Sequence, residues 1–596
     1  MIAEANSIST EASGQRTYNI LLMCVAGLGG LLYGVDIGII GGALPYLEAT
    51  SGLDAGQLSV IVAAVLLGSV ISTVFAGVLA DWMGRKPMMT LSGLIFVVSI
   101  PLIALSHGYG PLFFGRLLQG ISGGFIGVVV PLYLAECLPS SNRGKGTGIF
   151  QWLLTFGIVA AALIGIYYSY RVQAIASGAA EAAIFHVKDQ AWRHIFWISL
   201  PPGVLFVIGS LFVGESPRWL FRRGKHELAL ASLLRSRTRA KAELEFSEMQ
   251  MTSAQDEVAQ KNRGTLLRRK YVIPLLLACV ILFCNTATGV NSIIGYNTSI
   301  LLQSGLSDLA AHWGYVLFTT LNFLMTIVGM MLVDRKGRRF LLILGSTGLM
   351  LSLIVVGGLF WQTEKADIEC RQAVQSLVGP QQELTLRFDP AQAARLLADS
   401  GLKDNELPTD HASLAVIYSY GGFTGETSFV RSDDLAAAPI HITRKGSVPI
   451  NVVEAFFKNP FADLAAARTA PLRIERARIG RIPSARHGSL VALALFSFIA
   501  FFAIGPGVCV WLALSELMPT RIRSVGMSIA LVINQLVSTT LAVIFLPVAS
   551  KYGYSSMFFL FAGFTVIYLI TAAFFLPETK GKTLEEIEQH FEGSIA

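Results

Sequence analysis

The stretch "DWMGRK" at residues 81–86 returns in closely similar form as "DRKGRR" at 334–339, and this repeat decides the fold. Each copy lies between two long apolar segments and sets an acid, a glycine and an arginine at the same spacing. The first copy supplies Asp81, Gly84 and Arg85, and the second supplies Asp334, Gly337 and Arg338. A repeat at this separation predicts a chain built from two similar halves.

Two further pairs of motifs keep the same order in both halves. "AECLPSSNR" and "SELMPTRIR" match at Glu136 and Arg143 against Glu516 and Arg523, and "GESPR" and "PETKG" match at Glu215 and Glu578, with Arg218 ending the first. The copies are unevenly separated, which indicates an extra segment at 362–487 and a smaller extra loop at 170–192. Surface acid–arginine pairs at helix ends are weak, which suits a cytoplasmic gate that closes and reopens; a purely topological role is the alternative.

The composition is typical of a polytopic membrane protein. Of 596 residues, 53% are hydrophobic and only 14% charged, and the mean hydropathy is +0.59. A helix needs roughly 20 mainly apolar residues to cross about 30 Å of hydrocarbon. Twelve such runs occur in two groups of six, near 19–43, 57–80, 88–106, 111–135, 147–169, 193–213, 272–302, 312–333, 340–361, 489–515, 523–548 and 555–576.

The short loops predict the orientation of these spans. Lys and Arg gather in the loops on one side, including both copies of the repeat, whereas the loops at 44–56 and 303–311 on the other side contain neither residue. Positive loops stay in the cytoplasm, so both termini are expected there. The net charge of +7 needs no nucleic acid partner, because a basic face over anionic lipid accounts for it.

Taken together, "LLYGVD", "DWMGRK", "GRLLQGISGG", "GESPRWL", "DRKGRR", "GPGVCVW" and "PETKGKTLEEI" resemble the sugar porter family of the major facilitator superfamily. The resemblance implies an all-α membrane protein of two six-helix bundles that works by alternating access around a central site. The apolar runs and the segments between them divide the chain into an N-terminal bundle at 1–213, linker helices at 214–271, helices seven to nine at 272–361, an extracytoplasmic α+β insertion at 362–487, helices ten to twelve at 488–576, and a tail at 577–596.

One acid lies inside the first apolar run, at Asp36. Counting 1.5 Å per residue from each end places Asp36 and Arg116 at similar depths in the outer half of the membrane. A charge there is penalised by roughly 2.5 to 3.5 kcal/mol and needs a partner or a wet cavity, so the two residues are expected to pair. A fixed structural ion pair is one interpretation; in the resembled family an acid at this place is typical of proton-coupled members, which favours proton coupling.

Polar side chains on apolar helices are candidates for recognising sugar hydroxyls, because amides both donate and accept hydrogen bonds. Positions that contact sugar in the resembled family correspond here to Gln151, Asn291, Asn322 and Trp511. The family's paired glutamines in the seventh helix are replaced by Asn285 and Thr286, and its tryptophan in the eleventh helix by Gln535, after Asn534. These departures leave the cargo open among a hexose, a pentose, a polyol and another polar metabolite. Interhelical bonding is the alternative role for each amide.

The soluble segments show helical and mixed patterns. "KHELALASLLR" and "AELEFSEMQMTSAQDEVAQ" read as amphipathic helices of the linker. In the insertion, "LTLRF" and "PIHIT" predict strands, and "NVVEAFF" predicts a helix. "DPAQAARLLADSGL" predicts another helix, with Asp389 as its N-cap, Pro390 at its first position and Gly401 at its end. No catalytic or metal-binding constellation is visible, so the insertion is expected to cap the entrance, bind an unknown partner or decorate the loop.

The sequence therefore predicts a secondary active transporter that carries a monosaccharide or related polyol together with a proton, without a further cofactor. An uncoupled facilitator, a sensor that binds without flux, and a transporter of another metabolite are the alternatives. An enzyme is not expected. The expected location is a plasma or bacterial inner membrane.

Overall fold

The computed structural model describes the backbone of residues 2–176, 181–260, 269–400, 412–427, 429–434, 439–449, 455, 459, 462–518 and 523–578. Within these ranges, side chains are described except at 2–13, 140–147, 176, 181, 252–260, 269–271, 334, 511–516 and 523–525. The predicted helix "NVVEAFF" therefore lies almost wholly outside the described residues.

Twelve helical spans long and apolar enough to cross a membrane occur within the described residues, as predicted. Six of them are made by α1 (Ile2–Thr50), α2 (Ala55–Met83), α3 (Arg85–Ala104), α4 (Tyr109–Cys137), α5 (Ser140–Ala176) and the pair α6 (Glu181–Trp197) and α7 (Leu200–Phe212). The other six are made by α11 (Arg269–Ala287) with α12 (Val290–Gly295), α14 (Asp308–Lys336), α15 (Arg338–Glu364), α21 (Ala485–Ile504) with α22 (Pro506–Leu517), α23 (Arg523–Tyr552), and α24 (Tyr554–Ile570) with its π-helical end.

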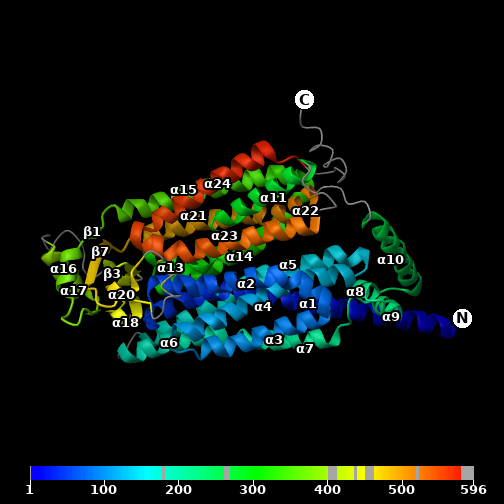
Figure 1. Cartoon of the computed structure of the whole chain (residues 1–596), viewed down its shortest axis with the longest axis horizontal. Coiled ribbons are helices and arrows are strands. Elements are labelled where there is room, and N and C mark those ends of the chain that lie inside the picture. Colours follow the sequence, from blue (N-terminus) through cyan, green and yellow to red (C-terminus); the bar gives the residue numbers. More distant parts are fainter. Residues whose placement is uncertain are drawn as a thin grey trace.

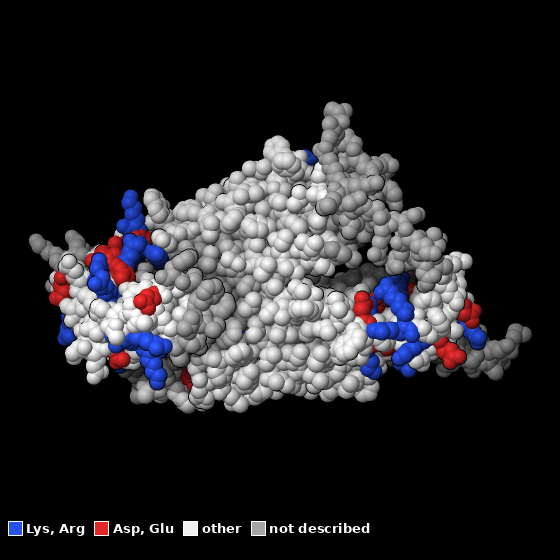
Figure 2. Space-filling view, viewed as in Figure 1, with Lys and Arg blue, Asp and Glu red and all other residues white. Residues whose placement is uncertain are grey.

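The spans form two bundles that lie side by side (Figure 1). In the view of Figure 2, charged side chains gather at the two ends of the molecule and leave an uncharged belt between them, as a hydrocarbon layer requires. The inserted segment lies at one end, here named the cap end (Figure 1). The chain's first residues and α8 (Pro217–Arg222), α9 (His226–Ser236) and α10 (Arg239–Gln260) lie at the other, here named the linker end.

The seventh span is broken, whereas the sequence suggested one continuous run over 272–302. Helix α11 ends at Ala287, and Gly289 begins α12 with a φ of +81°, a left-handed conformation that glycine adopts without strain. A side chain at Gly289 would also meet the ring of Phe561. Helix α13 (Asn297–Gln303) follows after a second interruption at Tyr296. Broken helices near the middle of a transporter bundle expose backbone groups that can bind ligand.

Glycines let α1 pack backbone to backbone against α5. A Cβ atom at Gly34 would lie 1.9 Å from the Leu154 carbonyl oxygen, and one at Gly157 would lie 2.4 Å from that of Leu31. Gly38 and Gly42 approach α5 backbone atoms to 3.0 Å in the same sense. The glycine-rich sequence of α1 thus sets the contact between the two helices, as small residues do in membrane bundles.

The linker helices α9 and α10 are present as predicted, and they are attached to the N-terminal bundle. The buried Arg237 donates to the carbonyl oxygens of Cys137 and Leu138 at the end of α4, at 3.0 and 3.1 Å. Its Nε lies 2.6 Å from Glu245 in α10. From α1, the Asn19 amide donates to the Ser236 carbonyl at 3.0 Å. These contacts fix the start of the linker to α1 and α4.

The inserted segment between α15 and α21, residues 365–484, is here named the cap, and it has the predicted α+β fold. A five-stranded antiparallel sheet has the order β1 (Ile368–Glu369), β7 (Leu472–Arg481), β3 (Ala412–Tyr420), β4 (Phe423–Glu426), with β5 (Val430–Arg431) also on β3. Strands β2 (Leu384–Leu386) and β6 (Ile440–Ile442) pair separately, where "LTLRF" and "PIHIT" predicted strands. Helix α17 (Pro390–Asp399) begins as expected, with the Asp389 carboxylate accepting from the backbone N–H of Gln392 at 2.7 Å. A core of its own packs between sheet and helices.

The expectation of a loop at 170–192 was wrong in one respect. Helix α5 continues to Ala176 and α6 begins at Glu181, so both helices extend beyond the usual span length at the cap end. The first half's extra residues therefore lengthen two helices. They reach the level of the cap, where Lys188 contacts Asp434.

The edge of the cap carries a titratable group beside the N-terminal bundle. Burial and, to a smaller degree, the Asp54 carboxylate at the start of α2 raise the pKa of Glu426 in β4 from its ordinary 4.5 to about 7, against the opposing effect of Lys551. Between pH 4.5 and 7 the folded protein binds more protons than the unfolded chain, so this group's contribution to stability is full below pH 4.5 and is lost as pH rises through 7.

Replacing Glu426 with Gln is therefore expected to stabilise the protein at pH 8 by about 1 to 2 kcal/mol, allowing for solvent screening, and to change little at pH 5. The measurement is thermal unfolding of the purified protein and the variant at both pH values. An equal effect at the two pH values would show that the carboxylate's charge does not matter to the cap.

Candidate functional site

The predicted coupling pair lies in the N-terminal bundle, on α1 and α4. Asp36 and Arg116 are both buried, with 1% of each exposed, and their charges lie close enough to interact. They are not joined by a direct hydrogen bond: neither Asp36 oxygen has a partner among the described residues. The Asp36 carboxylate lies instead against Gly123, where a Cβ would be 2.6 Å from Oδ2.

Gln119 occupies the stretch of α4 between the two charges, and sequence reasoning did not single it out. Arg116 lies two helical turns from Gly123, or about 10 Å toward the cap end. Gln119 is fully buried between them, and its Oε1 accepts from the Arg116 guanidinium at 2.6 Å. Its Nε2 has no partner within the described part of the chain. The signal in the sequence was the spacing, three residues after the arginine and four before the glycine.

Tyr33 extends this polar group across the bundle interface. It lies one turn before Asp36 on α1, packs on Gly123 and lies against Gln535 of α23 and Ser69 of α2. The predicted acid and one predicted substrate residue of the other bundle are therefore neighbours of the same phenol.

The remaining polar candidates of the C-terminal bundle are grouped by the broken seventh span. The Asn291 amide of α12 donates to Ser538 of α23 at 2.8 Å. Asn534 donates to the Thr286 hydroxyl and to the Leu282 carbonyl, the latter at 3.1 Å. Asn285 is buried and its Oδ1 is unpartnered among the described residues. Two of these amides therefore bond helices together, and Asn285 keeps an acceptor for a ligand.

Three further candidates lie on α5, α14 and α22. Gln151 is half-buried on α5, and Asn322 is buried on α14. Between α5 and α14 the rings of Trp152 and Phe323 stack with centroids 5.5 Å apart. Trp511 belongs to α22, and its side chain lies outside the described residues.

The bundles touch along their cap-end halves. From the C-terminal bundle, Tyr315 donates to the Gly38 carbonyl at 2.7 Å, and His312 lies 3.3 Å from that of Gly42. Asp308 accepts from Tyr46 at 3.0 Å and from Ser169 at 2.5 Å. These contacts join α14 to α1 and α5. The structure is therefore a form closed at the cap end.

At the linker end, the first copy of the repeat builds a buried ion pair. The Arg85 guanidinium donates to both Glu136 oxygens at 2.9 and 3.0 Å, and Asp81 lies 2.8 Å away. The Ser216 hydroxyl donates to Glu136 at 2.5 Å. Only 2% of the Arg85 side chain and 7% of the Glu136 side chain are exposed, so the expectation of a weak surface network was wrong for this pair.

Glu215 closes the loop between α2 and α3. Its carboxylate accepts from the backbone amides of Arg85, Lys86 and Ser216. Gly84 has a φ of +105°, and a Cβ there would lie 2.3 Å from Glu215, so glycine is required twice over. Burial raises the pKa of Glu215, and these three amides oppose the rise. Arg218, also predicted here, is exposed and takes no part in these contacts.

The second copy repeats the loop geometry. Gly337 has a φ of +88°, and Glu578 accepts from the amides of Arg338 and Arg339 at 3.2 and 3.3 Å. The two halves therefore share one arrangement: a glycine turn whose backbone amides donate to a glutamate that follows the last span of the same half. The side chains of Arg143, Asp334, Glu516 and Arg523 lie outside the described residues.

Comparison with known proteins identifies the family to which the chain is similar. The sugar (and other) transporter family matches residues 22–376 and 477–591, on both sides of most of the cap. The chain is 26% identical to the proton myo-inositol cotransporter of Homo sapiens over 95% of this chain and 81% of that one. It is 30% identical to the arabinose-proton symporter of Bacillus subtilis over 57% of this chain and 71% of that one.

Among solved structures, the inward open conformation of the xylose transporter XylE from E. coli has the same fold, with a TM-score of 0.64 at 19% identity. That match covers 96% of this chain and all of the other. The twelve spans in two bundles and the repeated glycine loops are consistent with the family whose model matches most of the chain. The chain is an integral membrane protein that belongs to the sugar (and other) transporter family.

Proposed function

We propose that this protein is a proton-coupled symporter for a monosaccharide or related polyol, with Asp36 as the proton-binding group. The observation that carries the proposal is a buried carboxylate without a hydrogen-bond partner among the described residues, placed beside the bundle interface and separated from Arg116 by Gln119. A buried acid of this kind either binds a proton or pairs with a cation, and Arg116 is the nearby cation here.

The cycle follows from the two arrangements that Asp36 can adopt. Ionised Asp36 attracts Arg116 and holds the cap-end half open. Protonation removes that attraction, and the bundles close at the cap end around the substrate. The structure supports this order, because it combines a closed cap end with an acid and a base that do not touch. Release at the linker end restores the ionised pair.

The substrate is proposed to bind where the broken seventh span faces α23. Asn285 offers an amide oxygen there that is unpartnered in the described part of the chain, and Gln535 lies on α23. Gln151 of α5 and Asn322 of α14 are proposed to complete the site. The relatives named for inositol, arabinose and glucose transport support a small polyhydroxylated substrate. The cap end is proposed to face outward, with both termini in the cytoplasm, in a plasma or bacterial inner membrane.

Uptake into proteoliposomes tests this function. With an inward proton gradient, at least one of labelled glucose, xylose, arabinose and myo-inositol is expected to accumulate, and a protonophore is expected to abolish the accumulation. A membrane potential of about 100 mV and one pH unit supply roughly 2.3 and 1.4 kcal/mol, which limits accumulation to several-hundred-fold. If the substrate only equilibrates across the membrane, and the protonophore does not change its uptake, the protein is a facilitator. Binding of substrate without flux would identify a sensor.

A further inference from the structure

Two segments interrupt the internal repeat, and the structure brings them together. The extension of α5 and α6 belongs to the first half, and the cap belongs to the second. Lys188 on α6 contacts both oxygens of Asp434 in the cap, at 2.7 and 2.8 Å. Only 12% of the Lys188 side chain and 34% of the Asp434 side chain are exposed, so solvent screens this pair less than a surface pair.

The cap is fastened to the C-terminal bundle. Both of its chain connections, to α15 and to α21, enter that bundle. Arg431 donates to the carbonyl oxygens of Leu302 and Leu306 at 2.9 and 3.4 Å, and Arg476 donates to that of Lys551 at 3.2 Å. The rings of Phe429 and Tyr554 lie 5.6 Å apart. The cap is therefore expected to move with the C-terminal bundle.

Lys188, in contrast, is fastened to the N-terminal bundle. Five residues further along α6, Arg193 donates to the carbonyl oxygens of Ala104 and Ser106 at 3.0 and 2.8 Å, and to Asp189 at 2.9 Å. These contacts tie α6 to the end of α3. The Lys188–Asp434 pair therefore bridges two bodies that must separate when the bundles part at the cap end.

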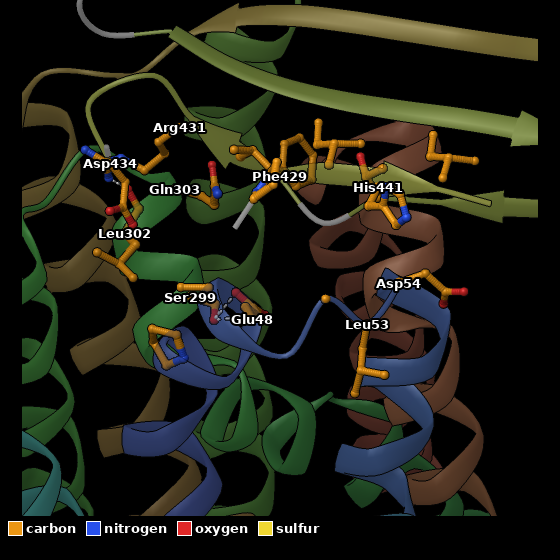
Figure 3. Close-up of a pocket in the computed structure, with 18 of the residues that line it drawn as sticks. Glu48, Leu53, Asp54, Ser299, Leu302, Gln303, Phe429, Arg431, Asp434 and His441 are labelled. Carbon is orange, nitrogen blue, oxygen red and sulfur yellow. Dashed lines mark hydrogen bonds between the residues drawn. The ribbon is translucent and has the colours of Figure 1, made fainter. Parts of the chain in front are cut away.

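Beneath the cap, a cavity of about 140 Å³ lies between cap strands, the end of α1, the turn before α2, and α13. Figure 3 shows Glu48 and Ser299 at its floor, Gln303 at the end of α13, and Phe429 and His441 of the cap on the opposite side. The Ser299 hydroxyl lies 3.4 Å from each Glu48 oxygen, a contact between the bundles. Solutes from the cap side would reach the bundle interface through this space.

We propose that the cap is an outer gate, held shut over this cavity by the Lys188–Asp434 pair and released each time the bundles part at the cap end. The inference rests on alternating access from the proposed function, and it goes further by assigning a task to the segment that interrupts the family match. The gate acts before the central site is reached, so it controls access and leaves coupling to Asp36.

Labelling of a new cysteine tests the gate without any substrate. Gln303→Cys places a thiol in the cavity, and a membrane-impermeant maleimide is added from the cap side to proteoliposomes. Lys188→Gln and Asp434→Asn, each made in this Gln303→Cys parent, are expected to raise the labelling rate about tenfold, because each removes one partner of a charge-assisted contact. The exchanged pair Lys188→Asp with Asp434→Lys is expected to return the rate to within about twofold of the parent.

Gln190→Glu is the matched control. It also lowers the charge of α6 by one, and Gln190 is exposed with its contact to His186 on the same helix. This variant is expected to label like the parent, and the chain that keeps Gln303 gives the background from the native thiols. Equal labelling of all variants would overturn the gate. A chain that transports none of the sugars would defeat the proposed function, and the labelling result would still decide whether the cap closes the cavity.

Discussion

Asp36→Asn is expected to abolish accumulation of substrate against its gradient, lowering it from as much as several-hundred-fold to equality across the membrane. An asparagine has nearly the shape of the carboxyl group but binds no proton in the relevant pH range. It fits the space beside Gly123 that the acid occupies. The variant therefore keeps the fold and loses the group through which the proton gradient acts.

The decisive comparison is between uphill uptake and downhill exchange in the same proteoliposomes. Exchange of labelled for unlabelled substrate is expected to persist in Asp36→Asn, since the bundles can still alternate. Glu243→Gln serves as the control, because it also removes one acid, on the exposed surface of α10. Continued accumulation by Asp36→Asn, with the protonophore still abolishing it, would place the proton on another group.

The twelve spans, the two halves and the candidate acid could be predicted because each depends on local sequence. Runs of apolar residues, repeated loop motifs and one acid in an apolar helix are visible without knowing any contact. The start of α17 at Asp389 was predictable for the same reason, because capping involves residues three apart.

Features that depend on distant residues could not be predicted. Strand β3 is buried along nearly its whole length and shows no alternation, so its pattern does not separate strand from helix. Its main partner β7 lies more than 50 residues later. Gln119 gained importance only when α1 placed Asp36 beside Gly123. The buried surroundings of Arg85 could not be predicted either, because they include Glu215 and Ser216, which lie far along the chain after the sixth span.

Breaking the buried pair at the linker end is expected to cost more stability than any exposed charge change. Arg85→Met leaves the Glu136 carboxylate with the Ser216 hydroxyl and without its two guanidinium bonds. An uncompensated buried charge of this kind costs about 3 to 5 kcal/mol. Thermal unfolding of the purified variant is expected to show a clear loss, and transport is expected to fall because α2, α3, α4 and the loop before α8 lose their common contact.

Two comparisons separate burial from charge. Arg239→Met removes an arginine from an exposed pair with Glu243, 3.0 Å apart, and is expected to cost no more than about 0.5 kcal/mol. The double variant Arg85→Met with Glu136→Met removes both buried charges and is expected to be more stable than Arg85→Met alone, because no unpaired ion remains. If Arg85→Met unfolds at the same temperature as Arg239→Met, the pair is solvated in the membrane and its role is confined to the transport cycle.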